Sequence, residues 1–293
     1  MTQEQGKNWH DKHYKKLMIL PIFVLVLALI FLFVFYQQTG DILIKDISLT
    51  GGTSITVQSE TDVNQLELDL SPKLPDLTIR RISDLRTGRQ LAFIVETSLD
   101  SNETKTILQD YLGFDLTEEN SSIEFTGSTL SASFYKQLRL AIIIAFVLMS
   151  LVVFIIFRTF IPSLAVIFAA FSDIVISLVI VDILGIKLSA AGIVAFLMLI
   201  GYSVDSDILL TTRVLRTREG SVNERLLSGF KTGITMTFTS LVAVLVSLAI
   251  VYSLSEILTQ IFMIISIGLV VDIFITYIGN LGILKWYAEI KRL

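Results

Sequence analysis

Aspartates lie within the long apolar stretches of this chain, and four of them are the residues best suited to chemistry. Asp205 and Asp207 belong to the segment LIGYSVDSDILLTTRVLR, while Asp173 and Asp272 lie in two other apolar runs. An aspartate at the centre of a membrane helix costs about 2.5–3.5 kcal/mol on insertion scales, so its presence points to a function. Low-dielectric surroundings favour the protonated carboxyl group, which can then take up and release a proton. The four aspartates are therefore candidates for a proton relay.

The spacing within the pair restricts how it can act. Residues two apart on an α-helix point about 200° away from each other, so at most one of Asp205 and Asp207 can face a bundle interior. The other can serve a protein partner or a water-filled cleft. Lys231, at the start of the fifth apolar stretch, joins the relay candidates. A structural interpretation stays open, because nearby hydroxyl groups can hold a buried aspartate; we favour it for Asp173 and Asp272 taken singly. The available hydroxyl groups are those of Ser172, Ser177, Ser203 and Thr211.

Composition indicates a membrane protein and excludes several kinds of site. The 293 residues are 53% hydrophobic and 17% charged, whereas soluble domains average about 45–50% and about 25%. A net charge of −4 gives no attraction to nucleic acid. The chain has no cysteine, and its two histidines, His10 and His13, lie in the polar N-terminal tail. Residues 229–232 lack the Gly-Lys pair of a phosphate-binding loop. We expect no enzyme activity, no cofactor, no metal site and no nucleic-acid partner.

Hydropathy predicts six membrane helices, because about 20 apolar residues span a bilayer core. The predicted helices cover residues 17–36, 138–157, 161–184, 188–210, 233–252 and 257–284. Basic residues concentrate in the tail 1–16, the loop 211–232 and the tail 285–293, while the opposite short connections carry only Lys187. By the positive-inside rule, both termini are cytoplasmic in a multi-pass protein of the cell membrane.

The segment 37–136 is then an extracytoplasmic domain. Its patterns predict a small α+β sandwich with helices on one face. Gly51-Gly52 interrupts an alternating apolar pattern over residues 42–57, where a tight bend or a close backbone approach is needed. The other expected elements are helices 63–70 and 101–111, a hairpin of 77–85 with 90–96, and a strand 122–125.

The cytoplasmic loop 211–232 contains one further signal. Ser221 and Glu224 fit a capping box, which predicts a short helix along the membrane surface ending near Phe230. A plain turn with solvated charges is the alternative.

Two motifs, in the expected order, resemble the SecF family of the protein-export machinery. KDISLTGGT (45–53) is similar to the family signature KGIDFTGGT, and LIGYS (199–203) matches the fourth helix of the family, where an Asn-Asp pair usually follows. The motif positions of interest are Gly51, Gly52, Thr53, Gly201, Tyr202, Ser203 and Ser206. One helix, an external domain and five further helices is also the SecF plan, so the resemblance covers nearly the whole chain.

The resemblance implies an accessory subunit of the Sec translocase. Such a subunit pairs with SecD in a twelve-helix complex similar to the resistance-nodulation-division transporters, and its external domain is ferredoxin-like. Expected partners are SecD, the translocon channel, the unfolded exported polypeptide and membrane lipids. The proton gradient is the implied energy source for drawing the exported chain outward.

The chain departs from the family pattern at the positions that would carry protons. Ser206 stands where the family usually has its fourth-helix aspartate, with Asp205 and Asp207 on either side. Lys231 stands where bacterial members have arginine, whereas Arg213 matches the arginine that follows the fourth helix and is also a candidate for the proton relay. These differences resemble an archaeal version. Two other hypotheses are kept: half of a small-molecule or lipid exporter of the same superfamily, and a structural scaffold for the translocon.

Overall fold

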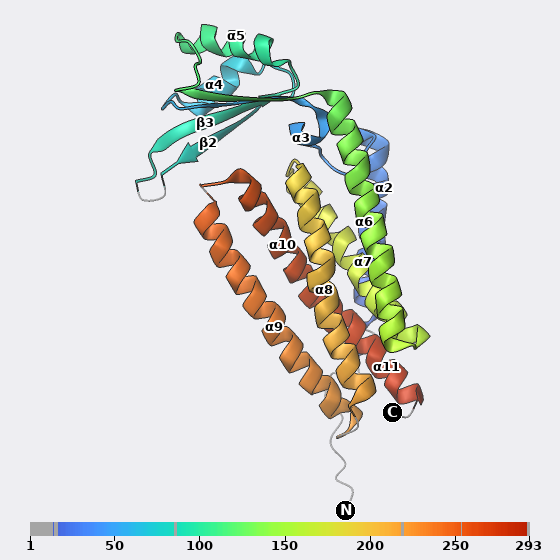
Figure 1. Ribbon diagram of the computed structural model, residues 1–293. Helices are drawn as coiled ribbons and strands as arrows, with labels where there is room; N and C mark the ends of the chain where they lie inside the picture. Colours follow the sequence, from blue (N-terminus) through green and yellow to red (C-terminus); the bar gives the residue numbers. More distant parts are fainter. Residues whose placement is uncertain (1–13, 15–16, 85–86, 218–219, 253, 292–293) are drawn as a thin grey trace, which may run out of the picture.

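The computed structural model describes residues 14, 17–84, 87–217, 220–252 and 254–291. It consists of a bundle of long helices with a small sheet domain at one end (Figure 1). Helix α2 begins, and helix α11 ends, at the end of the bundle away from the sheet (Figure 1). Most of the basic N-terminal tail lies outside the described residues, as does Arg218.

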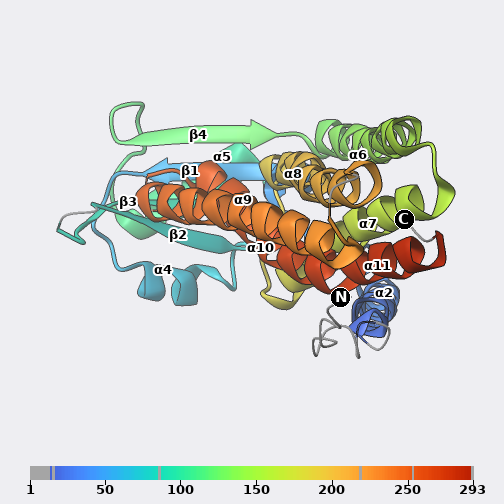
Figure 2. The ribbon, with the colours of Figure 1, turned by 90° about the horizontal axis from the view of Figure 1, so that it is seen from below.

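Six helices are long and apolar enough to cross a membrane. They are α2 (Ile19–Thr39), α6 (Ser128–Phe157), α7 (Phe160–Ile183), α8 (Ala190–Arg216), α9 (Val222–Val251), and α10 (Glu256–Phe274) with its continuation α11 (Leu281–Lys291). Helices α7, α8 and α10 are the most buried, whereas α2, α6 and α9 expose most of their apolar surface. Seen along the bundle, α6 and α8 lie on the same side as strand β4 (Ser121–Thr126), and α2 lies on the opposite side (Figure 2).

The prediction of a separate surface helix that starts near residue 221 is wrong. The capping box itself is present: Glu224 N–H donates to Ser221 Oγ at 3.3 Å, and the Ser221 N–H donates to Glu224 Oε2 at 2.8 Å. However, the helix that starts there continues without a break to Val251. Gly229 and Gly233 do not end it, because they serve close packing instead: a Cβ there would lie 2.9 Å from Leu210 Cδ1 and 2.6 Å from the Tyr277 hydroxyl, respectively.

The other helix bounds differ from the expected ones mainly at polar ends. Helix α6 begins at Ser128 instead of residue 138, and α8 extends to Arg216 instead of ending at residue 210. Hydropathy finds only the part of a helix that lies in apolar surroundings, so polar turns that project beyond it are missed.

The sheet domain has the ferredoxin-like order of elements. After a short helix α3 (Ile47–Thr50), the chain forms β1 (Gly52–Val57), α4 (Val63–Leu70), β2 (Thr78–Ser83), β3 (Gln90–Thr97), α5 (Ser101–Leu112) and β4. The four strands are antiparallel in the order β2-β3-β1-β4. Helices α4 and α5 cover the face that points away from the bundle (Figure 1). Alternate apolar residues of the strands point toward these helices and form the domain core with Leu66 and Leu108.

The start of the domain differs from the alternating strand suggested for residues 42–57. Asp46 accepts a hydrogen bond from the Ile47 N–H at 2.6 Å and so caps the short helix α3, which delays the strand to Gly52. The need for two glycines is confirmed. A Cβ on Gly51 would lie 2.5 Å from Ser128 Cα, and Gly51 has φ +87°, which favours glycine.

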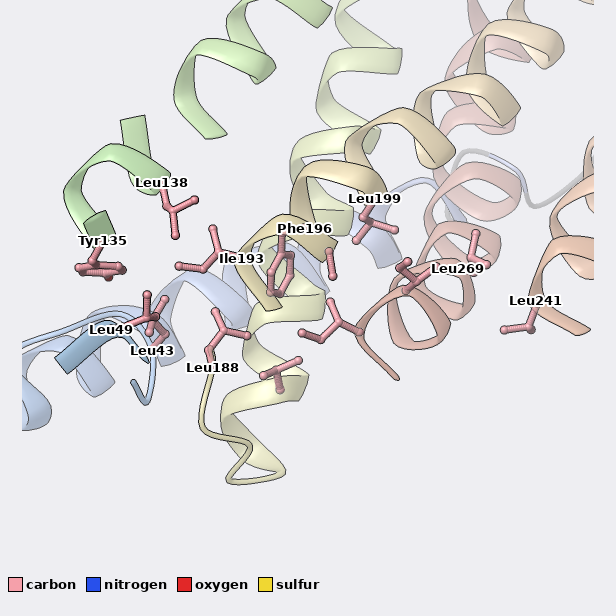
Figure 3. Packing of buried hydrophobic residues seen from close by; sticks show 14 residues of the cluster. Leu43, Leu49, Tyr135, Leu138, Leu188, Ile193, Phe196, Leu199, Leu241 and Leu269 are labelled. Atoms are coloured by element: carbon pink, nitrogen blue, oxygen red, sulfur yellow. The ribbon is translucent and has the colours of Figure 1, made fainter. Parts of the chain in front are cut away.

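One apolar core joins the domain to the bundle. Leu43 and Leu49, which precede β1, pack in the same cluster as Leu188 and residues of α8, and the cluster continues to Leu269 on α10 (Figure 3). The linker that leads into the sheet domain is therefore part of the bundle's packing.

Candidate functional site: a carboxyl cluster in the bundle

Three aspartates from three helices meet inside the bundle. Asp173 comes from α7, Asp207 from α8 and Asp272 from α10, and each is fully buried. Asp173 and Asp207 both interact with Asp272. The three most buried membrane helices thus each contribute one carboxyl group to the same place.

Asp272 lies between hydroxyl groups. Ser206 Oγ is 3.2 Å from both of its carboxyl oxygens, Thr276 Oγ1 donates to Oδ1 at 3.1 Å, and Thr237 Oγ1 is 3.5 Å from Oδ2. Ser206 Oγ is also 2.8 Å from the Ser203 carbonyl oxygen, so its single proton has two acceptors available. Asp272 is therefore held by neutral donors that can reorient.

Asp207 and Asp173 have neutral partners as well. Thr276 Oγ1 lies 3.0 Å from Asp207 Oδ1, and Asn280 Nδ2 donates to the same oxygen at 2.6 Å. Ser203 Oγ donates to Asp173 Oδ2. This last bond is the one that the structural interpretation of Asp173 expects. The remaining oxygens of these two carboxyl groups, Asp173 Oδ1 and Asp207 Oδ2, are buried without a hydrogen-bonding partner in the described part of the protein.

A π-helical segment supplies two of these partners. Residues Ile275–Asn280 (η1) interrupt the α-helical pattern between α10 and α11, and both Thr276 and Asn280 lie in this segment. π-Helical turns inside α-helices are frequent at functional sites. Gly233 on α9 faces the Tyr277 side chain of the same segment.

The cluster has no basic partner among the described residues. The ion pairs Lys45–Asp41, Arg80–Glu96 and Arg89–Glu60 all lie in the external part, away from the three aspartates. Lys231 and Arg213, which were candidates for the relay, are exposed and make no ion pair with the aspartates in the described structure. The geometry does not bring either of them into the cluster.

Asp205 is also outside the cluster. It lies on the exposed face of α8, as do Gly201 and Tyr202 of the LIGYS motif, whereas Ser203 and Ser206 are buried. The opposite orientations expected for Asp205 and Asp207 are confirmed. The residues Gly52 and Thr53 of the first motif begin β1, and Gly51 directly precedes this strand, so all three belong to the sheet domain and not to the carboxyl cluster.

The sequence contained a signal for the partners that were missed. Asp272, Thr276 and Asn280 are spaced by four residues within the last apolar stretch, which places polar side chains along one side of a helix. Thr237 and Ser206 carried no comparable signal, because single hydroxyl residues are common in membrane helices.

Comparison with known proteins assigns the family. The family model described as "Protein export membrane protein SecD/SecF, C-terminal" matches residues 105–290. A protein-export membrane protein SecF from Methanolacinia petrolearia is 39% identical over 94% of this chain and 94% of its own length. The SecF proteins of Methanothermobacter thermautotrophicus and Methanocaldococcus jannaschii are 40% and 36% identical over 96% of this chain, and over 94% and 98% of their own lengths. The chain belongs to the SecF family.

A solved structure agrees with this assignment at the level of the fold. The SecDF protein of Thermus thermophilus, described as a translocon-associated membrane protein, matches with a TM-score of 0.73 at 20% identity. The match covers 100% of this chain and 40% of the SecDF chain. This member of the SecF family, with its six apolar helices, is thus a multi-pass membrane protein of protein export.

Proposed function

We propose that this chain assists export across the cell membrane as the partner of SecD, and that its buried carboxyl cluster binds and releases protons. The observation that carries the proposal is the meeting of Asp173, Asp207 and Asp272 among hydroxyl and amide partners. Both aspartates that were favoured as structural residues when taken singly belong to this cluster.

Elementary electrostatics supports proton binding at this place. Three negative charges close together in low dielectric repel one another strongly, and no cation among the described residues offsets them. The carboxyl oxygens without protein partners, Asp173 Oδ1 and Asp207 Oδ2, are positions where a proton can reside. Moving one elementary charge through 100 mV supplies about 2.3 kcal/mol, enough to change the relative populations of two helix packings.

The exposed face of α8 supports pairing with SecD. Asp205 lies on this face beside the hydroxyl-bearing Tyr202 and below the apolar side chains of Met198 and Val194. A carboxyl group at this depth is unfavourable against lipid, so a partner helix with a donor or a basic side chain fits this face better than acyl chains do. The pairing is supported further by the SecDF likeness.

The proposed topology places both termini in the cytoplasm and the sheet domain outside. Basic residues of the loop between α8 and α9 and of the C-terminal end support this orientation, and α11 ends at the end of the bundle opposite the sheet (Figure 1). The proposed role is non-enzymatic. The sheet domain contacts the exported polypeptide or the translocon channel, and the bundle contacts membrane lipids.

An export assay tests the proposal. In cells that depend on this chain, Asp272→Asn is expected to reduce secretion of a reporter while the chain still co-purifies with SecD. Asp110→Asn is the matched control, since Asp110 is an exposed acid on α5. Normal secretion in a variant in which Asp173, Asp207 and Asp272 are all replaced by asparagine would overturn the proton-binding role.

A further inference from the structure

The turn that connects α7 to α8 is held from two sides. Residues 184–189 lie at the sheet end of the bundle, between the linker into the sheet domain and the first turns of α10 (Figure 1). The proposed function gives this turn no role. Its hydrogen bonds nevertheless connect the external domain to the helices that carry the carboxyl cluster.

On one side, the turn pairs with the linker of the sheet domain through the backbone. Leu188 N–H donates to the Ile44 carbonyl oxygen at 2.6 Å, and Asp46 N–H donates to the Leu188 carbonyl oxygen at 3.0 Å. Ser48 Oγ accepts a further hydrogen bond from the Ala190 N–H, the first residue of α8, at 3.1 Å. The linker therefore follows any displacement of the start of α8.

On the other side, the turn is held by one side chain of α10. Gln260 is 8% exposed, and both ends of its amide are used. Its Nε2 donates to the Lys187 carbonyl oxygen at 2.7 Å, while its Oε1 accepts from the Ser189 N–H at 3.1 Å and from the Ser189 hydroxyl group. Gln260 thus fixes both the end of the turn and the capping residue of α8.

Close packing continues this connection toward the carboxyl groups. A Cβ on Gly192 would lie 2.7 Å from Gln260 Oε1, and a Cβ on Gly268 would lie 2.3 Å from Leu199 Cδ1. The two helices touch at the level of Gln260 and again at Leu199, which lies between the turn and Asp207 along α8. Tightly packed helices move as units, since interiors leave few voids to absorb displacement.

We propose that Gln260 is a positioning residue that couples the external domain to the carboxyl cluster. It does so by keeping the α7–α8 turn, and with it the linker 43–48, in register with α10. The inference rests on the proposed function, because the carboxyl cluster is taken as the part that changes state. Such coupling requires a structural element whose conformational equilibrium is shifted by both sites.

A distance measurement in a double-mutant cycle tests the coupling. The chain has no cysteine, so spin labels can be placed at Arg81→Cys on β2 and Tyr252→Cys at the end of α9, both exposed. The distance between the two labels is measured in the full chain, bound to SecD in lipid nanodiscs. Four labelled chains are compared: the unaltered one, Asp272→Asn, Gln260→Ala and the double variant. We expect Asp272→Asn to shift the label-to-label distance with Gln260 and to leave it unchanged in Gln260→Ala.

Two further variants separate coupling from a general loss of structure. Thr259→Val is the matched control, because Thr259 Oγ1 is bonded to the Val251 and Ser255 carbonyl oxygens and not to the turn. It should preserve the shift. Ser48→Ala weakens the opposite side of the turn and should reduce the shift, which keeps the test available if Gln260→Ala does not fold.

Two outcomes overturn the coupling. The first is an equal shift in the Gln260 and Gln260→Ala backgrounds. The second is the absence of any shift on Asp272→Asn with Gln260 intact. Neither outcome affects the proposed proton binding, which is decided separately by the secretion assay.

Discussion

Replacing Asp207 with asparagine removes one ionisable group from the cluster while keeping its hydrogen bonds. Asp207 Oδ1 accepts from Thr276 Oγ1 and Asn280 Nδ2, and an asparagine oxygen in the same position accepts both. The new amide NH₂ takes the place of Oδ2, which has no protein partner. We expect Asp207→Asn to change the free energy of unfolding by about 1 kcal/mol or less, since no bond between described groups is lost.

Alanine at the same position gives the contrasting result. Asp207→Ala leaves the amide donor of Asn280 buried without an acceptor, which costs about 1–3 kcal/mol, whereas Thr276 Oγ1 can still donate to Asp272 Oδ1. A loss of about 1–3 kcal/mol is therefore expected from this unpaired donor, which is a substantial fraction of the stability of an ordinary domain. Thermal unfolding in detergent, followed by helical circular dichroism, distinguishes the two variants.

The decisive measurement is secretion by the asparagine variant. We expect Asp207→Asn to fold and to co-purify with SecD like the unaltered chain, but to export a reporter poorly, because the site has lost a proton-binding group. If Asp207→Asn were both stable and fully active in export, Asp207 would be a structural residue and the reasoning from its burial would be wrong.

Three further results are expected. Asp205→Asn should leave the melting temperature unchanged but weaken co-purification with SecD, since its side chain lies on the exposed face of α8; unchanged recovery would argue against that face as the interface. Burial and the nearby Asp46 raise the pKa of Glu96 despite Arg80 and Lys187. The folded chain disfavours the ionised carboxylate, so its stability falls as pH rises from the ordinary pKa of a glutamate through the raised pKa. Glu96→Gln should therefore raise the melting temperature more at pH 7 than at pH 4, and an equal effect at both would contradict this. Gly51→Ala should destabilise the chain by more than about 1 kcal/mol, because its Cβ would clash with backbone at positive φ, and an unchanged melting temperature would refute it.

Much of the architecture could be predicted from local patterns in the sequence. Apolar runs of sufficient length indicate the six spans, and turn residues such as Gly88 and Gly113 bound the elements of the sheet domain. Helix α4 has the predicted bounds, Val63–Leu70. These features depend on residues close together in the chain, which is why a single sequence suffices for them.

The site depends on contacts that no local pattern reports. Asp173, Asp207 and Asp272 come from three different helices, and the sequence does not say which faces of those helices meet. Lys231 and Arg213 were reasonable partners by charge, yet both are exposed. The convergence depends on the packing angles of the bundle, which are set by many side chains together.

The π-helical segment at Ile275–Asn280 has a consequence for the length of the last span. A π turn holds an extra residue compared with an α turn, so if these residues became α-helical with none deleted, everything that follows would rotate by about 100°. Asn280 would then swing away from Asp207, while the apolar length of the span would hardly change. Hydropathy profiles would look the same in both cases, so homologous sequences should be compared at this point by counting residues between Asp272 and Asn280.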